Sequence, residues 1–396
     1  MTFNVADRIG NWICEVRPSS SVAVLLSNNT KNQYNYTENS VVKSGYAGEW
    51  VTVIGNATRP SGLIIGDETR LVSSTITNVG ATPLSLTKAI VTYVTGNVAY
   101  VALLSNSQLV NTIATPVSLG AVTNSTIQIE ALSSSIALVT YQTSAGVKVS
   151  KLSYDGTTLT VASTATVYNN TALDHKLVKV STTSAVVSYV DATNALKLLT
   201  ISDALTLGTV NNFGTIGNEF DITFNNNKLL LVYLDTNLKS SVGTISSGVI
   251  TFGASTDVTA YAVSKIHLIS TDTNTNLCAF YHSTGFVEYV QLTMDTYDVN
   301  SVSTNVIFVG DIVKVKGAYV SDIALTSTYN KNVVLSYKTT NGKLEIVDIT
   351  INANTVSVNN INTLVNSNGG TVEVIALYED SIICVYSGLY DFLYVV

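Results

Sequence analysis

Short runs of almost wholly apolar residues, each ending in tyrosine, recur along most of the chain. Each run is followed by a polar turn and then by a stretch in which apolar and polar residues alternate. The runs are AIVTY at Tyr93, ALVTY at Tyr141, AVVSY at Tyr189, LLLVY at Tyr233, LCAFY at Tyr281, VVLSY at Tyr337 and IICVY at Tyr386. Successive tyrosines lie 48, 48, 44, 48, 56 and 49 residues apart. Seven copies at a period near 48 residues predict a repeat architecture.

Each unit predicts about four β-strands. A run that is apolar at nearly every position is expected of a strand covered on both faces, and an alternating run is expected of a half-buried strand. In the second unit, IALVTY is followed by the turn QTSAG, the strand VKVSKLS, the turn YDGT and the strand TLTVAST. Such turns indicate β-hairpins, and a lead-in such as HKLVKVS before AVVSY supplies a further strand.

Four strands in a unit of this length are the anatomy of a β-propeller blade. A four-stranded sheet cannot bury both of its faces alone, whereas packing between two neighbouring sheets buries both. We therefore expect an all-β fold, a seven-bladed β-propeller that spans residues 66–396. The competing architecture is a β-solenoid, whose rungs are usually much shorter than this repeat.

The last unit predicts how the ring closes. It stops at LYDFLYVV, about one strand after its tyrosine, so it lacks a complete set of strands. The segment TRLVSSTIT at residues 69–77 precedes the first unit and could supply the missing strand. Joining both ends of the propeller in one sheet would remove an open edge.

Residues 1–65 lie outside the repeat and differ from it in composition. All four arginines and both tryptophans of the chain fall within the first 70 residues. Arginine and tryptophan are strongly enriched at the energetic centres of protein interfaces. We expect a small β-rich docking segment with Arg8, Trp12, Arg17 and Trp50 as candidate anchors. The alternative is a small β-domain, or a strand layer on the propeller, whose core contains the two tryptophans.

Charge and cysteine content exclude several classes of protein. There are 20 basic and 27 acidic residues, with no basic block, which argues against nucleic acid and anionic membrane surfaces as partners. No apolar run approaches the length of a transmembrane helix. The three cysteines, Cys14, Cys278 and Cys384, are isolated and indicate neither a disulfide framework nor a metal motif. The first residues lack a secretory signal pattern, so we expect synthesis in a cytoplasm.

The sequence predicts no catalytic, cofactor-binding or metal-binding residue. His175, His267 and His282 have no ligand spacing, although three histidines on different blades could converge on a propeller axis. DTNTN at residues 272–276 places oxygens at alternate positions, as calcium loops do, but lacks the glycine and distal glutamate, so a polar turn is the simpler interpretation. Serine-hydrolase, dinucleotide and Walker motifs are absent, as are Asp-box, WD and kelch signatures.

Tyrosine is unusually abundant, at 21 residues. We expect the seven repeated tyrosines to pack between blades, with their hydroxyls bonded to polar partners. Tyr154, Tyr168, Tyr297 and Tyr329 fall in turns or connections between blades. Exposed tyrosine beside Asn, Ser and Thr makes a surface suited to sugars or proteins.

In composition and layout the chain resembles structural proteins of tailed bacteriophages, of the fibre, spike and decoration types. The surface is rich in Ser, Thr and Asn, a signal pattern is missing, and a distinct N-terminal segment precedes a large repeat domain. The resemblance implies a virion protein assembled in the host cytoplasm. In such a protein the N-terminal part docks to other virion proteins, and the distal part faces a host-surface glycan or protein. A homo-oligomer is compatible with it, although no heptads specify one.

Three functions are therefore compared. The first is a non-enzymatic virion attachment protein with a docking segment and a binding propeller. The alternative is an extracellular, lectin-like carbohydrate-binding propeller. The third is a glycan-cleaving enzyme, which would need acidic residues that converge at the axis or on a loop face.

Overall fold

The computed structural model describes most of the chain from residue 69 onward, together with short segments before it. The described ranges are 4–5, 14–15, 21–25, 33–38, 41–46, 50–54, 69–107, 110–123, 126–217, 219–282, 286–299, 302–310, 312–317, 320–327, 332–352, 355–365, 371–378, 381–387 and 393–395. Every regular element within these ranges is a β-strand. They contain no helix long and apolar enough to span a membrane.

Six antiparallel sheets of four or five strands follow one another along the chain, and we number them blades 1 to 6. Blade 1 contains β8 (Asn78–Ser85), β9 (Lys88–Thr95), β10 (Val98–Ser107), β11 (Val110–Ile113) and β12 (Val117–Ala121). Blade 2 contains β13 (Ile127–Ala131), β14 (Ile136–Thr143), β15 (Gly146–Tyr154) and β16 (Leu159–Tyr168). Blade 3 contains β17 (Asp174–Ser181), β18 (Ser184–Val190), β19 (Ala195–Ser202) and β20 (Asn211–Thr215).

The next three blades have the same strand order. Blade 4 contains β21 (Phe220–Asn225), β22 (Lys228–Leu234), β23 (Leu238–Ser246), β24 (Val249–Phe252) and β25 (Thr256–Asp257). Blade 5 contains β26 (Val263–Asp272), β27 (Thr275–His282), β28 (Phe286–Val299), β29 (Val302–Val309) and β30 (Val313–Gly317). Blade 6 contains β31 (Val320–Ser327), β32 (Asn332–Thr339), β33 (Leu344–Asn352) and β34 (Thr355–Val365).

A further, smaller sheet joins the two ends of the repeat domain, and we call it the closing sheet. Its strand order is β35 (Val372–Tyr378), β36 (Ser381–Ser387), β37 (Leu393–Val395) and β7 (Thr69–Val72). The pairing of β37 with β7 aligns Leu393 with Val72 and Val395 with Thr69. The strand expected from residues 69–77 therefore begins at Thr69 and completes the last sheet.

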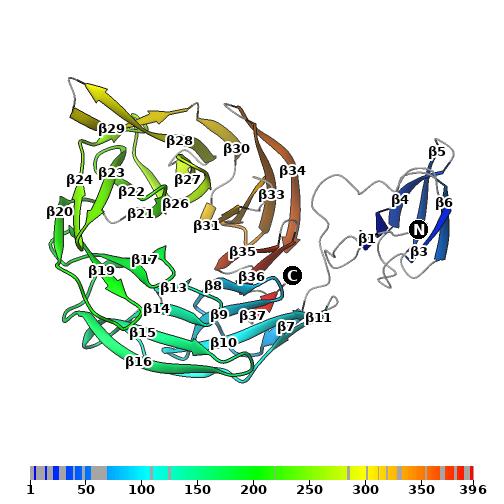
Figure 1. The fold of residues 1–396 in the computed structure, drawn as a ribbon, viewed down its shortest axis with the longest axis horizontal. Helices are drawn as coiled ribbons and strands as arrows, with labels where there is room; N and C mark the ends of the chain where they lie inside the picture. The colour runs from blue at the N-terminus through cyan, green and yellow to red at the C-terminus, as the bar shows by residue number, and fades with distance from the viewer. Residues whose placement is uncertain are drawn as a thin grey trace.

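The sheets are arranged as a ring around a central axis (Figure 1). The first strand of each sheet contacts the first strand of the next, in the cycle β8, β13, β17, β21, β26, β31, β35 and back to β8. The all-β propeller expected from the sequence is confirmed. The seven repeated tyrosines all lie on the second strand of their sheet.

Burial explains why these runs form the second strands. In β9 and β14 every residue except the first and last is buried, because the strand has a neighbouring strand on each edge and a neighbouring sheet on each face. The third strand β19 alternates over much of its length between buried and half-buried residues. The apolar core is thus divided among the junctions between sheets. At one junction, Leu138 of blade 2 packs with Val187 of blade 3.

The same packing continues across the closing sheet. Ile375 and Ile383 of that sheet share a buried cluster with Val79 and Val91 of blade 1. On its other face, Val374 packs with Ala324 of blade 6. Burial is therefore continuous around the ring.

Before residue 69 the described elements are short strands. They are β1 (Asn4–Val5), β2 (Cys14–Glu15), β3 (Ser21–Leu25), β4 (Gln33–Glu38), β5 (Val41–Tyr46) and β6 (Trp50–Ile54). β1 pairs with β2, β3 with β6, and β4 with β5. Arg8, Trp12 and Arg17, and the side chain of Trp50, lie outside the described residues, so the docking role stays a prediction.

One buried polar residue interrupts the apolar core between blades 2 and 3. His175 of β17 is fully buried, and neither ring nitrogen has a hydrogen-bond partner within the described ranges. Burial lowers the pKa of His175, and this effect outweighs the nearby charge of Asp174. The folded protein therefore holds His175 as the neutral imidazole.

We predict that residues 69–72 can be locked to the C-terminal strand by a disulfide. In the variant Thr69→Cys/Val395→Cys, the two cysteines occupy paired positions of β7 and β37, and Cα atoms of paired residues are close enough for a disulfide. Oxidation should then cross-link the chain and raise Tm, because the bond closes a long loop in the unfolded chain. Mass spectrometry of the tryptic peptides and thermal melts measure both effects. In the control Thr69→Cys/Ser135→Cys, the second cysteine lies in the turn between β13 and β14, and no intramolecular cross-link is expected. Equal cross-linking of the two variants would contradict the observed register.

We predict a second effect, on the pH dependence of stability. The pKa of His175 is lower in the folded than in the unfolded protein, so protonation of the unfolded chain costs stability as the pH falls below about 6.5. His175→Gln should remove this contribution, which amounts to about 1 kcal/mol between pH 6.5 and pH 5.5. Urea titrations at both pH values measure the free energy of unfolding. His282→Gln serves as the control, since His282 is half-buried. A pH dependence unchanged in His175→Gln would show that another group dominates.

Candidate functional site

Aromatic side chains pair across successive blade junctions. Tyr168, at the end of β16 in blade 2, stacks on Tyr189 of blade 3 with ring centroids 4.6 Å apart. At the next junction, Phe213 of β20 meets Tyr233 of blade 4 edge to face at 5.1 Å. In both cases the outermost strand of one blade supplies a half-buried ring, and the repeated tyrosine of the following blade supplies a buried one. The repeat therefore places an aromatic pair at equivalent points of two junctions.

A lysine lies opposite the repeated tyrosine in each of these blades. Tyr189 pairs with Lys197 between β18 and β19, and Tyr233 pairs with Lys239 between β22 and β23. Side chains of paired residues point to the same face of a sheet. The lysines are only partly exposed, with 26% of the Lys197 side chain and 27% of the Lys239 side chain accessible.

An aspartate in the intervening hairpin turn accompanies each lysine. Lys197 Nζ lies 3.9 Å from Asp191 Oδ2, and Lys239 Nζ lies 2.8 Å from Asp235 Oδ2. The Thr193 hydroxyl donates to Asp191 Oδ1 at 2.6 Å, which is the largest cause that lowers the pKa of Asp191. The hydrogen bond from Lys239 lowers the pKa of Asp235 and raises that of Lys239. Asp191, Asp235 and Lys239 are therefore ionised at neutral pH.

These two junctions combine three chemical functions in one place. An aromatic ring offers an apolar face, an ammonium donates hydrogen bonds, and a carboxylate accepts them. Adjacent hydroxyl groups of a sugar can accept from the lysine and donate to the aspartate, while the C–H face of the ring contacts the tyrosine or phenylalanine. We call the set Tyr168, Tyr189, Asp191 and Lys197 the 2/3 junction site. The 3/4 junction site is the set Phe213, Tyr233, Asp235 and Lys239.

The junction between blades 4 and 5 is built differently. Tyr261, in the connection before β26, lies edge to face against His282 with ring centroids 4.1 Å apart. Its hydroxyl donates to Glu288 Oε2 at 2.5 Å, and Lys314 Nζ lies 3.9 Å from Glu288 Oε1. The Glu288 side chain is only 3% exposed. Here the carboxylate is buried, whereas the side chains of Asp191 and Asp235 are 14% and 48% exposed, so this junction offers a ligand less of its carboxylate than the other two.

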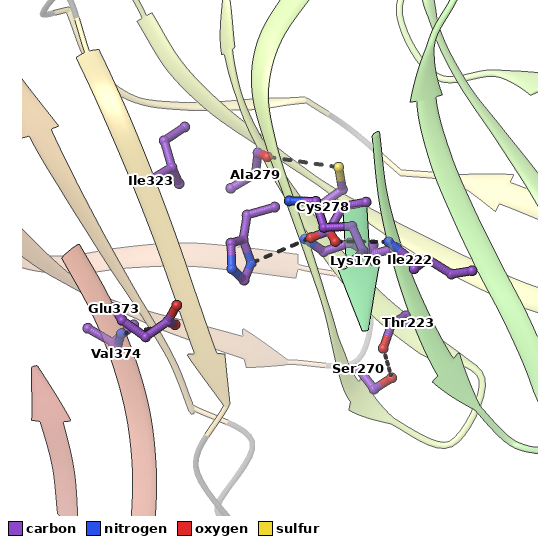
Figure 2. A network of polar contacts seen from close by, with 12 residues as sticks. Lys176, Ile222, Thr223, Ser270, Cys278, Ala279, Ile323, Glu373 and Val374 are labelled. Atoms are coloured by element: carbon purple, nitrogen blue, oxygen red, sulfur yellow. Dashed lines mark hydrogen bonds and ion pairs between the residues drawn. The ribbon is translucent and has the colours of Figure 1, made fainter. Parts of the chain in front are cut away.

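A second polar region surrounds the axis of the ring. The first strands bring together Lys176 of β17, Asp221 of β21, His267 of β26, Asp322 of β31 and Glu373 of β35, whose charges act on one another. Figure 2 shows Lys176, Ile222 and Glu373 on strands of three different sheets within this network. We call these five residues the axial cluster.

Two acids of the axial cluster bind the backbone of the next sheet. Asp221 Oδ2 accepts from the Leu268 N–H at 2.7 Å, which links blades 4 and 5. Asp322 Oδ2 accepts from the Val372 N–H at 3.1 Å, which links blade 6 to the closing sheet. Their carboxylates thus satisfy backbone donors at the inner edge of the ring, where the strands of neighbouring sheets are not paired.

The same strands carry hydroxyl groups with this role. Thr82 Oγ1 accepts from the Ala131 N–H, and Thr326 Oγ1 accepts from the Ala376 N–H, at 3.0 and 3.1 Å. Side chains at the inner edge therefore connect neighbouring sheets at several points. The axial acids belong to this structural pattern.

The histidines and the asparagine-rich turn do not form metal sites within the described part of the chain. His175 and His267 lie on first strands near the axis, whereas His282 ends the second strand of blade 5. No group of three or more His, Cys, Asp or Glu residues suited to a metal ion occurs in that part. Residues 272–276 span the end of β26, a two-residue turn and the start of β27, and Asp272 Oδ1 accepts from the Thr273 N–H at 2.8 Å. The turn instead contacts the adjacent blade through Asn274, whose side chain bonds Asn226.

The repeated tyrosines pack between blades as expected, and some hydroxyls find partners. The Tyr141 hydroxyl lies 3.0 Å from Ser150 Oγ, and the Tyr233 hydroxyl lies 2.7 Å from Ser255 Oγ. The sequence did not predict the lysines and aspartates of the two junction sites as binding residues. A signal for them exists, because Tyr-x-Asp occurs at Tyr189 and again at Tyr233, and at no other repeated tyrosine. The axial cluster has no comparable signal, since its members are a full repeat apart.

Comparisons with known proteins bear on the fold. No protein-family model and no curated protein matches the chain. Among solved structures, the BP39L lectin from Burkholderia pseudomallei matches with a TM-score of 0.61 at 10% identity, covering 82% of this chain and 95% of the lectin. The β-propeller domain of Myceliophteria thermophila Cps50 (Swd1) matches with a TM-score of 0.55 at 9% identity, over 83% and 97%. A lectin of Aleuria aurantia in complex with Fucalpha1-6GlcNAc gives 0.49 at 14% identity, over 74% and 97%. The chain is thus similar in fold to β-propellers, lectins among them.

Proposed function

We propose that this protein is a carbohydrate-binding propeller whose glycan sites are the 2/3 and 3/4 junction sites. The proposal is supported by one arrangement of side chains that recurs in two blades. An aromatic pair, a half-buried lysine and a turn aspartate stand at the same place in two successive blades. Two copies of one binding surface on a rigid ring suit a ligand with repeated units, such as a surface polysaccharide.

Packing alone does not account for the charged residues of these sites. The apolar clusters at both junctions are complete without Lys197 and Lys239. The equivalent turn of blade 1 has Thr95 where blades 3 and 4 have aspartate. A hairpin turn without an aspartate therefore also fits a blade, and the Asp–Lys pairs can serve a ligand.

The likeness to the BP39L lectin supports the proposal as far as the fold goes. A propeller is also the fold of the Cps50 domain, and a fold alone does not fix function. The argument for glycans therefore depends on the junction chemistry. A binding role without catalysis agrees with the lectin named in that comparison.

The acids that converge at the axis do not favour the third function considered, that of a glycan-cleaving enzyme. Asp221 and Asp322 accept backbone hydrogen bonds from the neighbouring sheet. A general acid or a nucleophile must instead face its substrate. We therefore assign the axial cluster a structural role.

We also propose that the closing sheet serves as a seventh blade. It has four strands in the same antiparallel order, its β36 carries the repeated Tyr386, and it packs on blades 1 and 6. Residues 1–65 would then precede the ring at the outermost strand of that blade.

The virion role remains a separate proposal. It depends on docking through Arg8, Trp12, Arg17 and Trp50, and on localisation in a phage particle. None of the observations above bears on these points. A glycan-binding propeller is compatible with it, because host attachment is one use of such a surface.

We predict that the full chain binds glycans and that each lysine controls one site. A printed array of neutral and acidic glycans identifies the preferred terminal sugar, and calorimetry with its methyl glycoside measures affinity and stoichiometry. Lys197→Ala and Lys239→Ala should each weaken one site about tenfold or more, because each removes a charged hydrogen-bond donor. The double variant should lose both sites.

The control is Lys228→Ala, at the hairpin on the opposite end of the strands of blade 4. It should bind as the unaltered protein does, and circular dichroism verifies that all variants are folded. An array without any bound glycan, or a double variant with full affinity, would refute the proposal.

A further inference from the structure

The turn of the 2/3 junction site holds its aspartate by one oxygen. Asp191 Oδ1 accepts three hydrogen bonds, from the Thr193 hydroxyl at 2.6 Å, the Thr193 N–H at 2.9 Å and the Ala195 N–H at 3.1 Å. The backbone closes the same turn, because the Asp191 N–H donates to the Ala195 carbonyl at 3.0 Å. Turn donors gathered on one oxygen fix the orientation of the carboxylate, so Asp191 Oδ2 keeps a defined position.

The other oxygen and the lysine face each other without a direct bond. Lys197 Nζ lies 3.9 Å from Asp191 Oδ2, which is beyond hydrogen-bond distance. Within the described part of the chain, Asp191 Oδ2 accepts no hydrogen bond and Lys197 Nζ donates none. An ammonium with three free donors thus lies beside a carboxylate oxygen with free lone pairs. Two adjacent sugar hydroxyls can bridge this gap, one as the acceptor from Lys197 and the other as the donor to Asp191.

The corresponding pair of the 3/4 junction site is closed. Lys239 Nζ donates to Asp235 Oδ2 at 2.8 Å. This hydrogen bond is the largest cause that lowers the pKa of Asp235, ahead of the turn backbone. A ligand must therefore replace an existing hydrogen bond before it gains its own. The aromatic ring is also more occupied, because Phe213 packs edge to face against Phe252 at 5.0 Å as well as against Tyr233.

The length of the two turns explains this difference. Asp191 precedes Lys197 by six residues, whereas Asp235 precedes Lys239 by four. The longer turn of blade 3 lets Thr193 fold back onto the carboxylate. Among the three donors on Asp191 Oδ1, the Thr193 hydroxyl makes the shortest hydrogen bond and is the largest cause that lowers the pKa of Asp191.

We propose that Thr193 is the positioning residue that makes the 2/3 junction site the stronger of the two glycan sites. Its hydroxyl holds Asp191 apart from Lys197, so the pair stays open for two adjacent hydroxyls of a neutral sugar. Thr193 acts through Asp191 and does not itself hold the sugar. This inference rests on the proposed glycan-binding function and deepens it, because it ranks the two sites and assigns the ranking to one side chain.

The first measurement compares two proteins that keep one site each. Lys239→Ala keeps the 2/3 junction site, and Lys197→Ala keeps the 3/4 junction site. Calorimetry gives each a Kd for one probe, the methyl glycoside of the terminal sugar that binds best on the glycan array. We expect Lys239→Ala to bind about threefold more tightly or better, because a ligand of the other protein must replace an exposed ion pair worth about this factor.

The second measurement changes Thr193 in the Lys239→Ala background. Thr193→Val keeps the shape of the side chain and removes the hydroxyl, so affinity at pH 7 should fall about threefold or more. Without this donor the pKa of Asp191 rises, and the site needs the ionised carboxylate. The loss of affinity should therefore be larger at pH 4 than at pH 7. Thr193→Ser retains a hydroxyl and should restore both the affinity and the pH profile.

Other groups near Asp191 do not produce this pH profile. Lys197 also lowers the pKa of Asp191, but it is a smaller cause than Thr193 and is present in every variant of this series. Burial raises the pKa of Tyr189, so its hydroxyl stays neutral from pH 4 to pH 7. A change in the acid limb of binding therefore reports on the bond from Thr193.

Thr236→Val, in the turn of blade 4, is the matched control. Thr236 follows Asp235, and its hydroxyl makes no hydrogen bond within the described ranges. In the Lys197→Ala background, this variant should leave the affinity of the 3/4 junction site unchanged at both pH values. Circular dichroism at pH 4 and pH 7 verifies that every variant is folded.

The outcomes separate this inference from the proposed function. If no glycan binds on the array, the proposed function fails and the inference fails with it. If glycans bind but Lys239→Ala and Lys197→Ala have equal Kd values, the ranking is overturned while the proposed function stands. If Thr193→Val weakens binding equally at pH 4 and pH 7, or if Thr193→Ser does not restore binding, Thr193 only shapes the turn and its positioning role is overturned.

Discussion

The structure depends on one constraint: a sheet of the propeller cannot bury both of its faces without a neighbour on each side. The second strands are apolar on both faces, and residues such as Val139 and Leu231 are fully buried only because adjacent blades cover them. An open row of such sheets would leave two apolar faces in water. Closure into a ring removes both, and the pairing of Thr69–Val72 with Leu393–Val395 ties the last sheet to the start of the repeat.

Radial packing has a cost at the inner edge, where first strands approach each other without pairing. Their backbone donors need acceptors, and side chains of the neighbouring sheet supply them. Asp221 and Thr82 illustrate two chemical solutions to the same problem, a carboxylate and a hydroxyl. The carboxylates place negative charge near the axis, and nearby acids raise the pKa of Lys176, which keeps it charged. The polar centre of the ring therefore follows from its geometry and does not imply catalysis.

Much of this fold could be predicted from the sequence, because the burial constraint repeats at a fixed interval. The tyrosine-ended runs identify the second strand of each of the six blades and of the closing sheet, and the truncated last unit predicts the partner strand near residue 69. The 2/3 and 3/4 junction sites were harder to predict. Asp191 and Lys197 look like ordinary turn and strand residues until the structure places Tyr168 of the previous blade against Tyr189. Lys176 and Glu373 are almost 200 residues apart in the sequence, and only ring closure places their strands around one axis.

The axial cluster and the junction sites differ in how much hydrogen-bonding capacity remains for a ligand. At the axis, Asp221 and Asp322 are engaged with backbone donors of the next sheet, so their acceptor capacity is largely used within the protein. At the junctions, each lysine is bonded to or close to one aspartate on an exposed turn, and an ammonium group has three donors. Unused donors beside a half-buried aromatic ring are available to a ligand at little structural cost. The blade turns can therefore change without disturbing the ring, which is why we propose recognition at the turns and not at the axis.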